Sequence, residues 1–209
     1  MSSHLLHEIR NPLHNLSAGI DRWRQQLNDE QVSFLSRNLE RLESAMRQLT
    51  RWDVVREQLD TQHAVALRTW FHEFINDKVR PQLQTDHIHL DAHLEDVTVH
   101  VPPVFLELCF VTLFNNALEA AASGPAPRLL RLTARALAEM VEIRLSNSGP
   151  PFSDEVLTAQ GTQLVESSRG VGLGLVLVRR TLEQVGGAFS LENEEGHATV
   201  IMQIPGRPS

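Results

Sequence analysis

The sequence is poor in the residues that several common classes of protein depend on. Its 209 residues include one cysteine, Cys109, which excludes an internal disulfide framework and suits a reducing, cytoplasmic compartment. Tyrosine is absent and aromatic residues make up only 5% of the chain, which argues against stacking on single-stranded nucleic acid. No apolar stretch approaches the roughly 18 residues that span a bilayer, so we expect no transmembrane helix and no membrane contact.

Positive charge is scarce as well. The chain has 19 Lys and Arg against 26 Asp and Glu, a formal net charge of −7. Because clustered Lys and Arg hold a phosphate backbone, we expect no nucleic-acid partner. What the sequence does contain is an ordinary apolar fraction of 42%, which predicts a globular protein of one large domain or two small ones.

Apolar residues alternate three and four positions apart through the first sixty residues. This heptad spacing breaks at Asn28 and Asp29, where Asp29 can cap a second helix. Two long helices joined by so short a turn must lie antiparallel, and a second copy would cover their remaining apolar seam as a four-helix bundle. A plain structural hairpin is the alternative. The seam residues are Leu6, Ile9, Leu13, Leu16, Ile20, Trp23 and Leu27, then Val32, Leu35, Leu39, Leu42, Met46 and Leu49.

The remaining residues mix helical and strand patterns. The patterns predict helices over 69–79 (ended by Pro81), 102–122 and 173–185, the last capped by Gly186 and Gly187. They predict strands over 87–94, 97–101, 129–136, 140–145, 188–192 and 198–204, a loop over 147–169 and a frayed tail over 205–209. The sequence therefore predicts an α + α/β protein, with a helical hairpin at 1–62 followed by a two-layer α/β sandwich at 63–209.

A first candidate site lies in the first helix, at His7-Glu8-Ile9-Arg10-Asn11-Pro12-Leu13. His7 is at the edge of the apolar stripe, and Asn11 is one turn further along the same face. Pro12 removes a backbone hydrogen bond in mid-helix, and such a local inconsistency beside an exposed histidine often accompanies function. An ordinary surface histidine is the alternative.

Two further stretches have the chemistry to hold a nucleotide. Asn116 is a polar residue in the middle of a helix, and its amide oxygen suits Mg²⁺, although a solvated Asn is the alternative. Gly170-Val171-Gly172-Leu173-Gly174-Leu175 opens a helix, where free backbone N–H groups can bind a phosphate in the field of the helix dipole. The spacing is neither that of a dinucleotide fingerprint nor that of a Walker loop, and an ordinary surface loop is the alternative.

Together and in this order, these stretches resemble a sensor histidine kinase of two-component signalling. The string from His7 to Leu13 resembles the H box, and Asn115-Asn116-Ala117 the N box. Asn147-Ser148-Gly149-Pro150 resembles the first glycine box, and the stretch from Gly170 to Leu175, followed by Val178-Arg179-Arg180, the second. The resemblance covers essentially the whole chain. It implies a dimerisation and phosphotransfer hairpin followed by a Bergerat-type ATP-binding domain.

The resemblance also implies a role for each matching residue. His7 would attack the γ-phosphate of ATP, Glu8 would orient or deprotonate its imidazole, and Asn11 would position water for dephosphorylation. The phosphoryl group would pass to an aspartate of a response-regulator receiver domain. Asn116 would hold Mg²⁺. The residues implied to bind ATP are Asn115, Asn116, Asn147, Gly149, Arg169, Gly170, Gly172, Leu173 and Gly174.

Asn147 stands where the family usually has Asp to accept the adenine amino group. A neutral hydrogen bond contributes about 1 kcal/mol and a charge-assisted one about 1.5–3, so Asn147→Asp is expected to tighten ATP binding by about 1 kcal/mol. A second hypothesis is a scaffold of the same fold that docks a receiver domain without using ATP. A metal site at His87, His89 and His93, which share one strand face, is a third.

Overall fold

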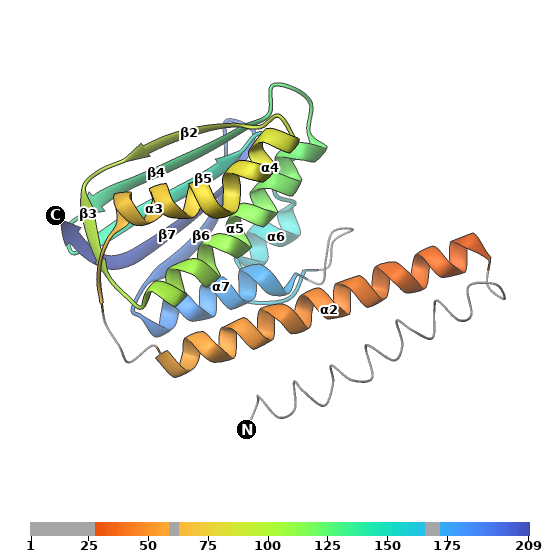
Figure 1. Cartoon of the computed structure of the whole chain (residues 1–209), viewed down its shortest axis with the longest axis horizontal. Coiled ribbons are helices and arrows are strands. Elements are labelled where there is room, and N and C mark those ends of the chain that lie inside the picture. Colours follow the sequence, from red (N-terminus) through yellow and green to blue (C-terminus); the bar gives the residue numbers. More distant parts are fainter. Residues whose placement is uncertain (1–27, 59–62, 166–171) are drawn as a thin grey trace.

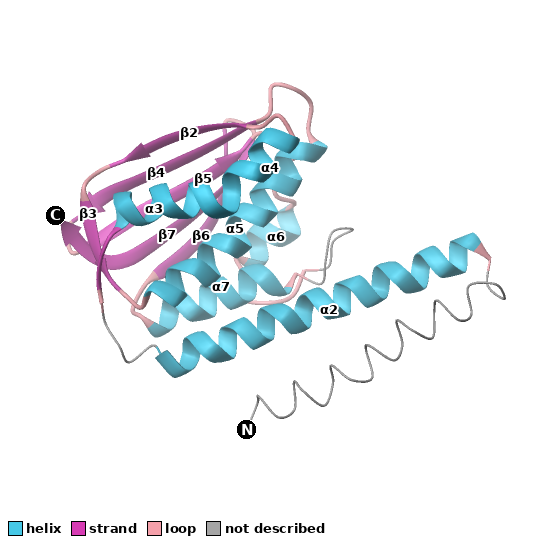
Figure 2. Ribbon diagram, in the orientation of Figure 1, coloured by secondary structure: helices cyan, strands magenta, loops and turns pink. Residues whose placement is uncertain are grey.

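The computed structural model describes residues 28–58, 63–165 and 172–209. A long helix, α2 (Asp29–Gln58), leads into an α/β part whose helices all cover one face of a single sheet (Figures 1 and 2). The helices of this part are α3 (Leu67–Phe74), α4 (Arg80–Thr85), α5 (Pro103–Ser123), α6 (Asp154–Ala159) and α7 (Leu173–Gln184), with a π-helical turn, η1 (Ile75–Val79), between α3 and α4. The predicted fold class is confirmed, and the first helix of the predicted hairpin lies outside the described residues.

The start of α2 is fixed by a capping box. The Asn28 side chain accepts a hydrogen bond from the Gln31 N–H at 2.8 Å, and the Gln31 side chain accepts from the Asn28 N–H at 3.1 Å. Asn28 is therefore the N-cap, and the prediction that Asp29 caps the helix is wrong. Asp29 instead occupies the first turn, where its negative charge favours the helix dipole.

The sheet has seven strands and is mixed. Its order is β1-β3-β7-β5-β4-β2, and β6 pairs with the first half of β7 on the same side as β3. All pairs are antiparallel except β2 with β4, which is parallel. The strands are β1 (Ala64–Ala66), β2 (His89–Leu94), β3 (Val97–His100), β4 (Leu129–Leu137), β5 (Met140–Asn147), β6 (Ala188–Glu194) and β7 (His197–Pro208).

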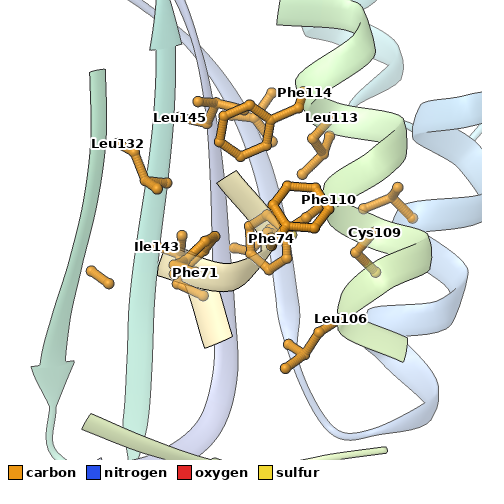
Figure 3. Close-up of a cluster of buried hydrophobic side chains, with 14 of the residues drawn as sticks. Phe71, Phe74, Leu106, Cys109, Phe110, Leu113, Phe114, Leu132, Ile143 and Leu145 are labelled. Atoms are coloured by element: carbon orange, nitrogen blue, oxygen red, sulfur yellow. The ribbon is translucent and has the colours of Figure 1, made fainter. Parts of the chain in front are cut away.

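The core between helices and sheet gathers most of the chain's few phenylalanines. Phe71 and Phe110 are fully buried and meet edge to face, with ring centroids 4.6 Å apart. Figure 3 shows them with Phe74 and Phe114 on the helical side, facing Leu132 and Ile143 on the strands. This single core fixes α5 on the sheet, and α5 carries the predicted N box.

α5 corrects one expectation from composition. It is long and apolar enough to span a membrane, so the statement that no stretch approaches that length is wrong. Most of the helix is buried inside the described part of the molecule, as expected of the central core helix of an α/β layer.

Three further predictions differ from the structure. The helix expected to end before Pro81 is followed without a gap by η1 and α4, and Pro81 lies in the first turn of α4, where proline is tolerated. The loop after Asn147 contains α6, whose six residues are too few to show a helical period. The tail expected to fray is the end of β7, where Gly206 pairs with Val99.

Candidate nucleotide-binding site

The exposed face of α5 carries the amides of the predicted N box. Asn115 and Asn116 are exposed, whereas Leu113 and Ala117 on the other face are buried in the core. The alternation follows from the helical period, which places residues three and four apart on the same side. In the middle of a helix the backbone groups bond to one another, so an exposed side-chain amide there remains available to a ligand.

Asn147 ends β5 and is buried between two backbone groups. Its Oδ1 accepts from the N–H of Gly149 at 2.9 Å, and its Nδ2 donates to the carbonyl oxygen of Ala198 at 3.3 Å. The next residue, Ser148, accepts the N–H of Leu129 on its hydroxyl at 2.8 Å. The first glycine box is therefore fastened to β7 on one side and to β4 on the other, and the orientation of the Asn147 amide is fixed.

Gly149 lies flat against the end of α5. A Cβ atom at this position would fall well inside van der Waals contact of the carbonyl group of Ala120. Glycine is thus required here for the loop to pack on α5, whether or not a ligand approaches. The contact joins the first glycine box to the helix of the N box, one turn beyond Asn116.

The N-terminus of α7 has no side-chain cap. Its N-cap is Gly172, in the left-handed conformation with φ +70°, and no acidic residue lies in the first turn. A Cβ on Gly172 would collide with the backbone of Val165, so glycine is required here too. The first N–H groups of a helix have no helical partner, which makes this end suited to an anion.

The structure brings several of the predicted site residues around one helix. α5 presents Asn115 and Asn116, contacts the Gly149 loop, and packs beside α7, which begins with Leu173 and Gly174. The predicted residues His7, Glu8, Asn11, Arg169 and Gly170 lie outside the described residues. Sequence reasoning missed the carbonyl groups of Ala120 and Ala198, since a backbone group has no signature in the sequence.

The hypothesis of a histidine metal site is wrong. No group of three or more His, Cys, Asp or Glu side chains within residues 28–58, 63–165 and 172–209 is arranged to hold a metal. His93 instead pairs with Asp91 at 3.0 Å, and Asp91 also pairs with Arg131 at 3.4 Å. The carboxylate of Asp91 is therefore already paired with Arg131 and is not free to bind a metal cation.

Comparison with known proteins agrees with this geometry. Residues 102–208, just over half of the chain, match the family model of histidine kinase-, DNA gyrase B-, and HSP90-like ATPases. The chain belongs to this family. Its resemblance to the ATP-binding catalytic core of sensor histidine kinases is confirmed by the curated relatives.

Two such relatives are the sensor protein FixL of Bradyrhizobium diazoefficiens and sporulation kinase E of Bacillus subtilis. FixL is 33% identical over 104 residues, which are 49% of this chain and 21% of FixL. Sporulation kinase E is 23% identical over 210 residues, covering 96% of this chain and 27% of that protein. The chain therefore spans about a fifth to a quarter of the length of these relatives.

Solved structures share the fold. Full-length ShkA in complex with AMPPNP superposes with a TM-score of 0.71 at 20% identity, over 99% of this chain and 46% of ShkA. Histidine kinase ThkA in complex with the response regulator protein TrrA gives a TM-score of 0.68 at 21% identity, over 98% of this chain and 60% of the ThkA chain. At these identities the likeness concerns the fold alone.

Proposed function

We propose that this chain is a protein-histidine kinase core that uses Mg-ATP to phosphorylate His7 and passes the phosphoryl group to an aspartate of a response regulator. The carrying observation is the uncapped N-terminus of α7, a helix that packs against α5 with its exposed amides, inside the segment that matches the ATPase family. The proposal divides the chain into a phosphotransfer hairpin at 1–62 and an ATP-binding domain at 63–209.

Each part of ATP has a chemically suitable partner. The N–H groups around Leu173 and Gly174 would hold phosphate oxygens, with the helix dipole favouring their charge. Asn116 would supply an amide oxygen to Mg²⁺, which completes its octahedral shell with water and phosphate oxygens and needs no protein cage. Asn147 keeps Oδ1 fixed by its two backbone partners, and the second lone pair of that oxygen would accept the adenine amino group.

The phosphoryl transfer itself needs mainly positioning and charge stabilisation. His7 must attack as the neutral imidazole, which favours a pH at or above its unperturbed pKa of about 6.5. Glu8 would act on the imidazole, and Asn11 would position the water that dephosphorylates the regulator. The last step makes the proposed protein a phosphatase as well as a kinase.

The proposed partners are a second copy of the chain and a receiver domain, in the cytoplasm. α2 leaves two large apolar side chains in solvent, Phe34 at 60% and Leu42 at 50% exposure. In a heptad-spaced helix such residues suit burial against a second hairpin. The ThkA–TrrA complex supports a receiver partner for this fold.

The competing function is a scaffold of the same fold that docks a receiver domain without ATP. The observation in its favour is Asn147, whose amide is neutral and already bonded on both of its atoms. Transfer of radiolabelled γ-phosphate from ATP separates the two functions, because only the kinase labels itself.

The decisive variant is His7→Ala, with His4→Ala and His14→Ala as matched controls on the same segment. We expect the wild type and both controls to become labelled, and His7→Ala to stay unlabelled. The label should be lost in acid and survive in base, because a phosphoramidate is acid-labile and base-stable. Label that persists in His7→Ala, or an unlabelled wild type at millimolar Mg-ATP, contradicts the proposal.

A further inference from the structure

The short helix α6 is fastened to the edge strand β6 at both ends by side-chain amides. Before α6, Asn193 accepts from the N–H of Phe152 and donates to its carbonyl oxygen, both at 2.9 Å. After α6, Gln160 accepts from the N–H of Leu191 at 2.7 Å and donates to its carbonyl oxygen at 2.8 Å. The Gln160 amide thus forms the two hydrogen bonds that a neighbouring strand would form with Leu191 on this edge, whereas the Asn193 side chain, which belongs to β6, forms its two bonds with the backbone of Phe152.

Gln160 differs from Asn193 because it also reaches α7. Its own carbonyl oxygen accepts from Nη1 of Arg179 at 2.8 Å. Arg179 is held in turn by Glu183, one helical turn further along α7, at 2.8 Å. Gln160 therefore connects the end of α6, the edge of the sheet and the middle of α7.

The residue that follows Gln160 continues this contact to the first turn of α7. Gly161 is buried with φ +71°, and a Cβ there would lie 3.1 Å from the carbonyl oxygen of Leu175 and 3.2 Å from the ring of Phe189. The Gln160–Gly161 turn is thus wedged between β6 and the start of α7. Its backbone conformation is also constrained at Gln160, which has φ +49° and ψ +30°.

We propose that Gln160 is a positioning residue for the nucleotide phosphates. It sets the first turn of α7 relative to the sheet, and so aims the N–H groups around Leu173 and Gly174. This inference rests on the proposed function, which assigns those N–H groups to ATP. Asn147 is fastened separately, to Gly149 and Ala198, so recognition of the base does not depend on Gln160.

Gln160→Met tests this positioning role, because Met has similar length and flexibility but cannot form the two side-chain hydrogen bonds to Leu191. Without the two bonds to Leu191, the first turn of α7 is less ordered in the free protein, and ATP must supply that ordering on binding. Since the bonds contribute about 1 kcal/mol each, we expect ATP affinity to fall by up to about tenfold. The affinity for adenosine, which has no phosphate, should not change. Gln203→Met is the matched control, since Gln203 is also half-buried and its side chain, among the residues that the structure describes, bonds only to Glu142, at 3.4 Å.

A second measurement needs no nucleotide. Deuterium exchange in the ligand-free protein should rise across 173–184 in Gln160→Met and stay unchanged in Gln203→Met. A comparable loss of ATP and adenosine affinity, or unchanged exchange in α7, would overturn the positioning role. Where adenosine binds too weakly to titrate, the exchange result together with the ATP affinity decides.

The outcomes also separate this inference from the function on which it rests. A wild type that binds ATP together with a Gln160→Met variant that binds it equally well overturns the positioning role alone. A wild type that binds no ATP overturns the proposed function and the positioning role together. Faster deuterium exchange in α7 of the Gln160→Met variant would then show that Gln160 has only a structural role.

Discussion

The side chain of Asn147 donates from Nδ2 to the carbonyl oxygen of Ala198, and this bond fixes which atom of the amide faces which neighbour. An aspartate here would turn an oxygen toward that carbonyl oxygen inside a buried site. Such a contact replaces a buried hydrogen bond with a repulsion. The charge that the family usually has at this position therefore carries a cost in this chain that the sequence did not show.

We accordingly expect Asn147→Asp to lower the free energy of unfolding by about 1–3 kcal/mol at neutral pH. The gain in ATP affinity expected from charge alone should be offset. Asn193→Asp is the control, because Asn193 makes the same two kinds of bond to Phe152 but in solvent. Thermal unfolding and calorimetric titration measure both effects. A more stable Asn147→Asp that also binds ATP tighter would show that the Ala198 bond does not matter.

The proposed Mg²⁺ ligand gives a second prediction. Asn116→Ala should weaken ATP binding about tenfold, or 1.4 kcal/mol, only when Mg²⁺ is present. Asn76→Ala, at an exposed position in η1, should leave binding unchanged in both conditions. Titrations with and without Mg²⁺ decide, and an equal loss in both would remove Asn116 from the metal site.

The glycine of the first box gives a third. Gly149→Ala should destabilise the protein by about 2–3 kcal/mol even without nucleotide, because the new Cβ meets the rigid backbone of Ala120. Gly186→Ala has only its positive φ of +74° to overcome and nothing within 4 Å, so about 1 kcal/mol is expected. Denaturant unfolding compares them. Equal losses would mean that the loop can move away from α5.

The exposed apolar residues of α2 give a fourth. Leu42→Asp, alone or with Phe34→Asp, would place a charge in the proposed dimer seam at a cost of several kcal/mol. Sedimentation should then show a monomer. Leu137→Asp, at a 43% exposed leucine on β4, should leave the dimer intact. A dimer that survives the α2 changes forms through another surface.

Cys109 gives a prediction that depends on pH. Burial raises the pKa of its thiol far above the ordinary value, so the folded protein keeps the thiol neutral. The unfolded chain can ionise above about pH 8.5. The thiol's contribution to stability is therefore complete below that pH and is lost as the pH rises further.

Denaturant unfolding at about pH 7.5 and about pH 9.5 tests this, with Cys109→Ala as the reference that lacks the thiol. Wild type should lose more stability than the variant between the two conditions. Native protein should also resist thiol-alkylating reagents until it unfolds. Rapid labelling of the native protein would mean that the α5 core opens readily.

The sequence predicted the elements whose signals are local and long. The helix over α7 and its cap were visible because Gly186 and Gly187 follow a clear helical period, and both donate to carbonyls of its last turn. The three residues of β1 and six of α6 carry no readable period. The parallel pairing of β2 with β4 depends on a crossover through β3 and α5, which no local pattern encodes.

The site followed the same division. Side chains with distinctive chemistry, such as Asn116 and Asn147, stood out as candidates from the sequence. The need for glycine at position 149 and the orientation of the Asn147 amide could not be predicted, because both depend on carbonyl groups of alanines far away in the chain. Gln160 was hidden for a similar reason, since its partner Leu191 is 31 residues away.

The long strand β7 has a consequence for the order in which the protein can be made. It borders β5 on one side and β6 and β3 on the other. These three strands therefore lack the partner on the edge that faces β7 until residues 197–208 are present. A nascent chain that ends before residue 197 therefore has no Ala198 for Asn147 to bond. The pairing of β6 with β7 is local, but those of β5 and β3 with β7 join residues far apart in sequence, and such pairings form late. The nascent sheet should thus stay unfinished until β7 emerges.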